Sequence, residues 1–125
     1  MRRIITFISL ALLIFSFSSR AQDLQKTDSI YRLLLLAPGD TSLTRSLNGS
    51  IDNLSYSLPD TAMYYALKLD SLSRLSGYIA GSAMALNMQG ICYQLSGDMR
   101  KAIELRSRIP RSSAAGLAST NKINN

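Results

Sequence analysis

Apolar positions recur every three or four residues along most of the chain, a spacing that predicts a succession of amphipathic helices. One helix is expected to begin at Thr27 or Asp28 and to stop at Pro38-Gly39. A second follows Asp40 or Thr41. Its leucine and isoleucine side chains fall on one helical face, formed by Leu43, Leu47, Ile51, Leu54 and Leu58.

The same spacing continues beyond Pro59-Asp60, which is expected to open a third helix that Gly77 stops. Its predicted buried side consists of Ala62, Tyr65, Leu69, Leu72 and Leu75. A fourth helix is expected over residues 78–95 and a fifth over residues 98–108. No segment keeps a period of two, and the connections are short. We therefore predict an all-α fold of antiparallel helical hairpins.

The amino terminus has the order of a secretory signal. Arg2 and Arg3 precede an apolar run over residues 4–17, and small residues then lead to Ala21, just before the polar Gln22. We expect cleavage after Ala21 and export to the periplasm or the medium. The alternative is an uncleaved membrane anchor, but an apolar helix over residues 4–17 spans about 21 Å, less than the roughly 30 Å of a hydrocarbon core. No stable membrane span is expected after cleavage.

The net charge of +6 suggests nucleic-acid binding until it is located along the chain. Residues 22–99 carry five Lys and Arg against seven Asp, a net charge of −2. From Arg100 onward there are six Lys and Arg against Glu104 alone. We therefore expect no nucleic-acid partner, and we interpret the basic end as a solvated, disordered tail.

Four segments follow from these patterns. They are a signal peptide (1–21), a leading helix and turn (22–40), helical hairpins (41–105) and a disordered basic tail (106–125). Cys92 is the only cysteine, so no intramolecular disulfide can form. It is expected to be a buried apolar residue of the fourth helix rather than a reactive thiol.

Two helices begin similarly, and the positions Ala62 and Ala102 stand forty residues apart. Such a period in an all-helical chain indicates a solenoid of hairpins. At this point the chain resembles the tetratricopeptide repeats, in the variety with a repeat of about forty residues. The resemblance rests on six signature positions, which are Leu86, Gly90, Tyr93, Gly97, Asp98 and Ala102. Met88 and Gln89 depart from it, since asparagine and an aliphatic residue are usual there.

The resemblance implies that small residues at Gly90 and Ala102 let two helices approach closely, that Tyr93 fills the space beside them, and that Gly97-Asp98 turns the chain. It also implies a groove lined by the first helix of the hairpin. The groove positions would be Met84, Asn87, Ile91, Gln94 and Leu95. The two amides could hydrogen-bond a peptide backbone, and the other three could make apolar contacts. The simpler alternative is that Ile91 and Leu95 pack against a neighbouring helix.

Little in the sequence favours catalysis or a cofactor. There is no histidine, and Glu104 is expected to pair with Lys101 and Arg108 on the surface of a helix. Most aspartates are expected to cap helices or lie in turns; these are Asp28, Asp40, Asp60 and Asp98. The glycines Gly77, Gly81, Gly90 and Gly97 are too scattered to form a phosphate loop. Tyr64, Tyr65, Tyr78 and Tyr93 are expected to pack in the core and groove rather than to stack on bases.

The leading hypothesis is an exported, non-enzymatic scaffold that binds a protein or peptide, and a further partner is a second copy bound through an uncovered terminal helix face. The layout resembles the exported sensor region of bacterial two-component histidine kinases. The repeat pattern stops after Leu105, where Arg106 and Ile109 replace the expected small and aromatic residues and Pro110 ends the helix. The alternative hypothesis is therefore a truncated amino-terminal remnant of such a receptor with little independent function.

Overall fold

The computed structural model describes residues 1–110, and within them the chain forms five α-helices and no strand. The helices are α1 (Arg2–Leu36), α2 (Thr41–Ser55), α3 (Pro59–Leu75), α4 (Ile79–Leu95) and α5 (Met99–Ser107). The predicted all-α class is confirmed. The predicted fourth helix, over residues 78–95, begins one residue before α4. The predicted fifth helix, over residues 98–108, extends one residue beyond α5 at each end.

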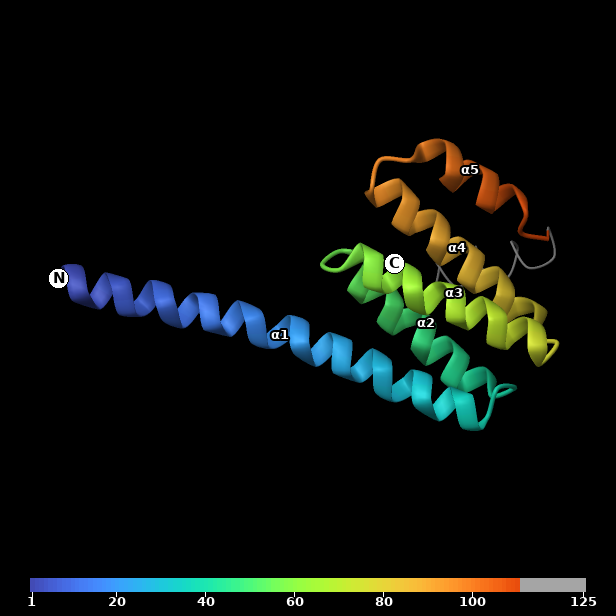
Figure 1. Cartoon of the computed structure of the whole chain (residues 1–125), viewed down its shortest axis with the longest axis horizontal. Helices are drawn as coiled ribbons and strands as arrows, with labels where there is room; N and C mark the ends of the chain where they lie inside the picture. Colours follow the sequence, from blue (N-terminus) through green and yellow to red (C-terminus); the bar gives the residue numbers. More distant parts are fainter. Residues whose placement is uncertain (111–125) are drawn as a thin grey trace.

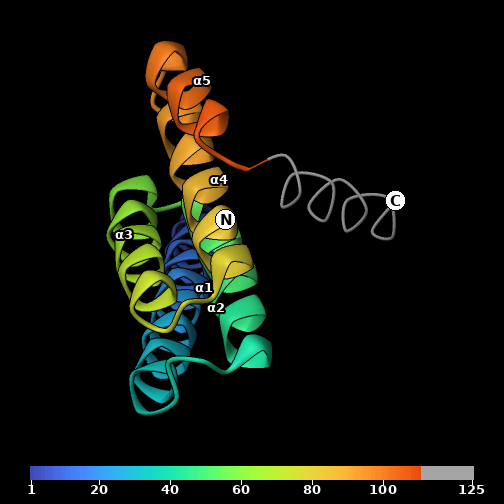
Figure 2. The same cartoon turned by 90° about the vertical axis from the view of Figure 1, so that its right-hand side faces the viewer.

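Consecutive helices run in opposite directions and pack against each other (Figure 1). Each of α1 to α4 contacts the helix that follows it, and α2 also contacts α4. Figure 2, turned by 90° from Figure 1, shows α2 and α3 in the lower part of the bundle. The helix α4 extends upward from them to α5, which lies at the top of this view. The helix α4 therefore packs against three other helices, whereas α5 has extensive contact with α4 only.

Side-chain caps and glycine turns set the helix ends. The Asp40 carboxylate accepts the Leu43 N–H at 2.9 Å, and the Asp98 carboxylate accepts the Lys101 N–H at 3.1 Å. Gly77 and Gly97 have φ of +72° and +90°, the left-handed region in which glycine closes a helix. These predicted turns and both caps are confirmed. Asp60 lies in the first turn of α3, but α3 has no side-chain cap, so its predicted capping bond is wrong.

The core lies among α1, α2, α3 and α4 and is almost entirely aliphatic. The predicted face of α2 is correct for Leu47, Ile51 and Leu54, which are fully buried, and for Leu43, which packs at the edge. Leu58 also packs against the core, but it lies beyond the end of α2, as the residue that precedes α3. On α3 the prediction is wrong at Leu75, which is 83% exposed because it is the last residue of the helix, at the turn. The remaining buried members of the core are Leu34, Ala62, Tyr65, Ala66, Leu69, Ala85, Met88 and Cys92.

The leading helix does not begin at Thr27 or Asp28, as predicted, because α1 is continuous from Arg2. No glycine or proline interrupts the chain before Pro38, so the helical backbone runs through the expected boundary. Thr27 and Asp28 therefore lie inside α1. The Thr27 hydroxyl hydrogen-bonds to Ser50 of α2, and Asp28 pairs with Arg32 at 2.9 Å, so neither residue caps a helix.

The first part of α1 extends away from the other helices (Figure 1). It contains an 18-residue window of mean hydropathy 1.8, none of which is buried. By length and composition this helix could cross a membrane, and a signal sequence near the amino terminus meets the same criterion. An apolar amino-terminal helix compatible with a signal sequence is therefore present. The predicted disordered tail lies outside the described residues from 111 onward, whereas its first two residues, 106 and 107, belong to α5.

Candidate binding surface on α4

The five predicted groove residues form one stripe along α4, here called the α4 stripe (Met84, Asn87, Ile91, Gln94 and Leu95). Met84, Asn87 and Ile91 are half-buried, and Ile91 packs against the core. Gln94 is exposed, and Leu95 is 46% exposed. The alternative of simple helix packing therefore describes Ile91 but not Leu95.

A comparison with α2 shows that the α4 stripe is unusually open. The positions forty residues earlier include Thr44, Leu47, Ile51 and Ser55, and all four are buried. The face of α2 that corresponds to the α4 stripe is thus covered by neighbouring helices. Among the described residues, nothing covers the stripe on α4 to the same degree.

Gln94 already has a partner that the sequence did not reveal. Its side-chain carbonyl oxygen accepts a hydrogen bond from the Arg106 guanidinium at 3.0 Å. The Arg106 side chain lies against Gly90, where an added Cβ would come within 3.6 Å of the arginine Cγ. Gln94 and Arg106 lie on different helices, twelve positions apart, and no local pattern links them. Asn87 is the amide of the stripe whose side chain has no hydrogen bond within the described part of the chain.

Four of the residues predicted to pack the hairpin are buried, and two of them, Gly90 and Ala102, lie side by side. Ala62 and Ala102 are fully buried, Leu86 is 8% exposed, and Gly90 lies beside the Ala102 carbonyl. An added Cβ at Gly90 would still be 3.5 Å from that oxygen, an ordinary contact. The α5 backbone thus reaches van der Waals contact with this position, as expected for a small residue there, and the Arg106 side chain packs beside it.

Among the glycines of the described residues, Gly81 is the most tightly surrounded, and no packing role was predicted for it. A Cβ there would overlap the Ser73 hydroxyl of α3 and would lie 2.7 Å from the Tyr78 ring. Ser73 is 2% exposed, so this contact is well inside the protein. A glycine near the start of a helix gives little signal by itself, since the need for it depends on where α3 places Ser73.

Tyrosine side chains make several specific contacts, not all of them in the core. Tyr65 is 6% exposed, whereas Tyr64 is 51% exposed, so core packing is wrong for Tyr64. Their rings meet edge to face at 5.2 Å, and Tyr31 meets Tyr65 at 5.7 Å. Tyr93 is half-buried beneath the Lys101 ammonium, which lies 5.2 Å from the ring centroid.

Burial, the hydrogen bond that its hydroxyl donates to Asp28 and the charge of that carboxylate raise the pKa of Tyr65 to about 12. Cys92 is 3% exposed, as predicted for an apolar core residue. Its burial, with the negative charges of Asp52 and Asp60, raises the pKa of the thiol. The thiolate form that reacts is therefore disfavoured.

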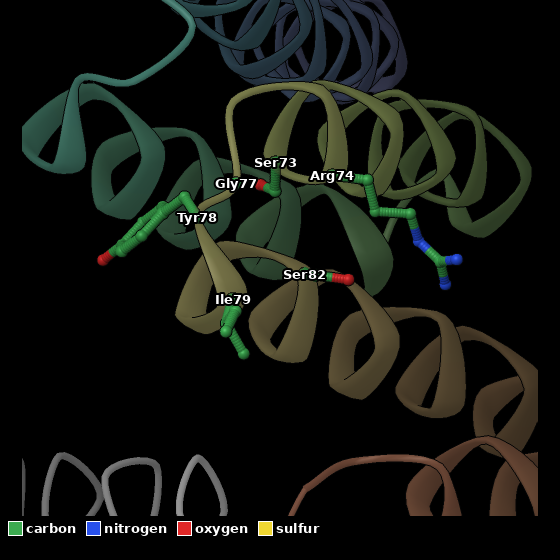
Figure 3. Close-up of a pocket in the computed structure, with 6 residues that line it drawn as sticks. All are labelled: Ser73, Arg74, Gly77, Tyr78, Ile79 and Ser82. Atoms are coloured by element: carbon green, nitrogen blue, oxygen red, sulfur yellow. The ribbon is translucent and has the colours of Figure 1, made fainter.

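A shallow pocket of about 290 Å³ lies at the turn between α3 and α4 (Figure 3). Its polar side chains are mostly occupied, since both Arg74 and Ser82 donate to Asp70. Figure 3 shows that Arg74 points away from Tyr78. A wider hollow between α1 and α2 includes Lys26 and Arg45 on its lining. Neither hollow includes a residue of the α4 stripe.

Acidic side chains of α5 and its N-cap form ion pairs on the surface of the bundle. Glu104 pairs with Arg108 at 2.8 Å, as predicted, but Lys101 lies 3.7 Å from Asp98 instead. Within residues 1–110 no three His, Cys, Asp or Glu side chains gather in a way that could hold a metal ion.

Comparisons with known protein families, with curated proteins and with solved structures find no match to this chain.

Proposed function

We propose that this chain is an exported, non-catalytic scaffold, similar to tetratricopeptide arrays, whose α4 stripe binds a peptide or a segment of a partner protein. The observation that carries the proposal is the difference between α2 and α4. Leu47 and Ile51 are fully buried, whereas Asn87 and Ile91, forty residues later, are only half-buried. A bound segment would cover α4 as neighbouring helices cover α2.

The side chains of the stripe define what such a segment would present. Met84, Ile91 and Leu95 offer apolar contact, and flexible methionine adapts to different partner side chains. The Asn87 amide supplies a donor and an acceptor between them. Two apolar side chains of α5 are exposed as well, Met99 at 50% and Ile103 at 62%. The expected partner therefore carries several apolar side chains with a polar group among them.

Export is supported by the amino-terminal part of α1. Its described side chains are exposed, and the first fully buried residue of α1 is Thr27, which hydrogen-bonds to Ser50 of α2. Removal of residues 1–21 would therefore leave the α4 stripe and the core intact.

Site-specific photo-crosslinking tests this proposal in cells that export the full chain. A photoreactive amino acid in place of Asn87 should give a discrete adduct, and the same substitution at Leu75 should not. Leu75 is the matched control because it is 83% exposed and lies at the far turn, away from the stripe. Adding Leu95→Asp should abolish the adduct, since a charge would replace an apolar contact.

The mass of the adduct identifies the partner. An adduct of twice the chain mass would mean that a second copy covers the stripe. Equal adducts from Asn87 and Leu75, or none from either, would contradict a binding function for the α4 stripe.

A further inference from the structure

Gln22 lies at the boundary between the free and the packed parts of α1. Every described side chain in residues 1–22 is exposed, whereas Asp23 is half-buried and Thr27 is fully buried. Among the described residues, the first hydrogen bond from α1 to another helix is that of Thr27 to Ser50, five residues after Gln22. If the Ala21–Gln22 bond is cut, Gln22 becomes the first residue, and both its α-amine and its side-chain carboxamide face solvent.

We propose that the exported protein carries a pyroglutamate at position 22, formed from Gln22 after the leader is removed. This inference rests on the proposed cleavage after Ala21. The reaction is internal to one residue. The α-amino nitrogen attacks the side-chain carbonyl carbon Cδ, a new N–Cδ bond closes a five-membered lactam, and the Cδ–Nε2 bond breaks. The nitrogen that leaves takes up a proton from the attacking amine and departs as ammonia, so no oxidant, reductant or second substrate is needed.

The helical setting favours the product. After cleavage the helix begins at residue 22, so its first backbone N–H groups have no intrahelical acceptor and the helix dipole is positive there. An α-ammonium at this end is repelled by the dipole, and it also repels the nearby Lys26 more than a neutral terminus would. Lactam formation removes that charge. The adjacent Asp23 carboxylate then remains as a favourable negative charge in the first turn.

The local sequence provides its own comparison. Gln25 is also exposed, but its nitrogen belongs to a peptide bond and cannot act as a free amine. Substitution of Gln22 by asparagine keeps an amide at the terminus, yet the corresponding ring would have only four members. Gln22→Asn is therefore a matched variant that permits cleavage and prevents closure of a ring onto the α-amine, so its α-amine stays free.

The test is the mass of the processed protein. The full chain, with its own leader, is exported from a bacterial host, and the intact mass is measured before any digestion. The expected product begins at residue 22 and is lighter than the uncyclised chain by one ammonia. Its tryptic peptide over residues 22–26 should show the loss at the first residue and not at Gln25. The Gln22→Asn variant should begin at the same position with a free amine and no loss.

Two results would overturn the inference, and they differ from each other. A product that begins at Gln22 with a free amine and the full mass would disprove ring formation while leaving export and cleavage standing. A product that retains residues 1–21, or that begins elsewhere, would disprove the cleavage site and the modification together.

Discussion

At the scale of single residues, the two buried glycines of α4 have different roles. A Cβ added at Gly81 would overlap the Ser73 hydroxyl and would lie 2.7 Å from the Tyr78 ring. A Cβ added at Gly90 would lie 3.5 Å from the Ala102 carbonyl oxygen, which is an ordinary contact. The resemblance to a known repeat drew attention to Gly90. The contact at Gly81 depends on the tertiary position of α3, so the sequence contained no signal for it.

We therefore expect opposite outcomes from two alanine substitutions in one helix. Gly81→Ala should destabilise the protein by about 1–3 kcal/mol, because the Ser73 and Tyr78 side chains packed around it must shift to admit the methyl group. Gly90→Ala should be neutral or stabilising by up to about 1 kcal/mol, because alanine favours the helix. Urea unfolding followed by circular dichroism measures both. No loss at Gly81 would mean that the α3–α4 contact is looser than the structure shows, and an equal loss at Gly90 would mean that α5 packs more tightly on α4 there.

Gln89 is a buried polar residue whose amide nitrogen has no hydrogen-bond partner. It is 6% exposed, at a position where the repeat pattern has an aliphatic residue. Gln89→Leu should therefore stabilise the protein by about 1–2 kcal/mol, since an unsatisfied donor is removed. The control is Gln94→Leu, which loses the bond to Arg106 and should give no gain in the same unfolding experiment.

Tyr65 links α1 and α3 through its bond to Asp28, and its pKa is raised from 10.0 to about 12. The folded state holds this proton more tightly than the unfolded state. The stability from this group is therefore complete below pH 10.0 and is lost as the pH rises through about 12.

Spectrophotometric titration should show a late tyrosine that disappears in Tyr65→Phe, a variant also expected to lose about 0.5–1.5 kcal/mol in stability. Tyr56→Phe is the control because Tyr56 is 73% exposed. If the late step persists in Tyr65→Phe, another tyrosine is responsible for it.

At the scale of helices, the sequence pattern was most informative where a glycine, a proline or an aspartate marks an end. Asp40, Gly77, Gly97 and Asp98 set ends of four helices, and each was predicted, the turn at Gly97 with the help of the resemblance to a known repeat. The start of α1 was missed because residues 18–27 contain no helix breaker and no apolar period. The partial exposure of the α4 stripe could not be predicted from the sequence for a different reason, because it depends on how many helices pack around α4.

The helix α1 offers a test of which of its faces holds the bundle together. Leu34 is fully buried, and Leu36, half a turn later, is 85% exposed. Leu34→Ala should cost about 2–5 kcal/mol, because it leaves a cavity in the core. Leu36→Ala should change the free energy of unfolding by less than about 0.5 kcal/mol. Similar effects from both variants would show that α1 docks on another face.

At the scale of the whole molecule, residues 1–110 form a packed bundle and an apolar extension, and the extension is the first part of the same helix, α1, whose second part packs in the bundle. Deletion of residues 1–21 should leave a protein that unfolds cooperatively with an almost unchanged midpoint, since no described side chain before Asp23 is buried. Deletion of residues 1–36 should abolish cooperative unfolding, because it removes Leu34 and the Thr27–Ser50 hydrogen bond. A broad, non-cooperative melt of the first protein would indicate that the leader supports the bundle.

The continuity of α1 also orders events in time. Proteases act on extended backbone, and the Ala21–Gln22 bond lies within an uninterrupted helix. Cleavage at this bond would therefore have to precede helix formation over residues 18–22, or to wait until that stretch unwinds. The part left by cleavage, residues 22–36, would be short for an independent helix in water and would form stably only as α2 packs against it. The rate of cleavage relative to helix formation would then decide which form of the protein accumulates.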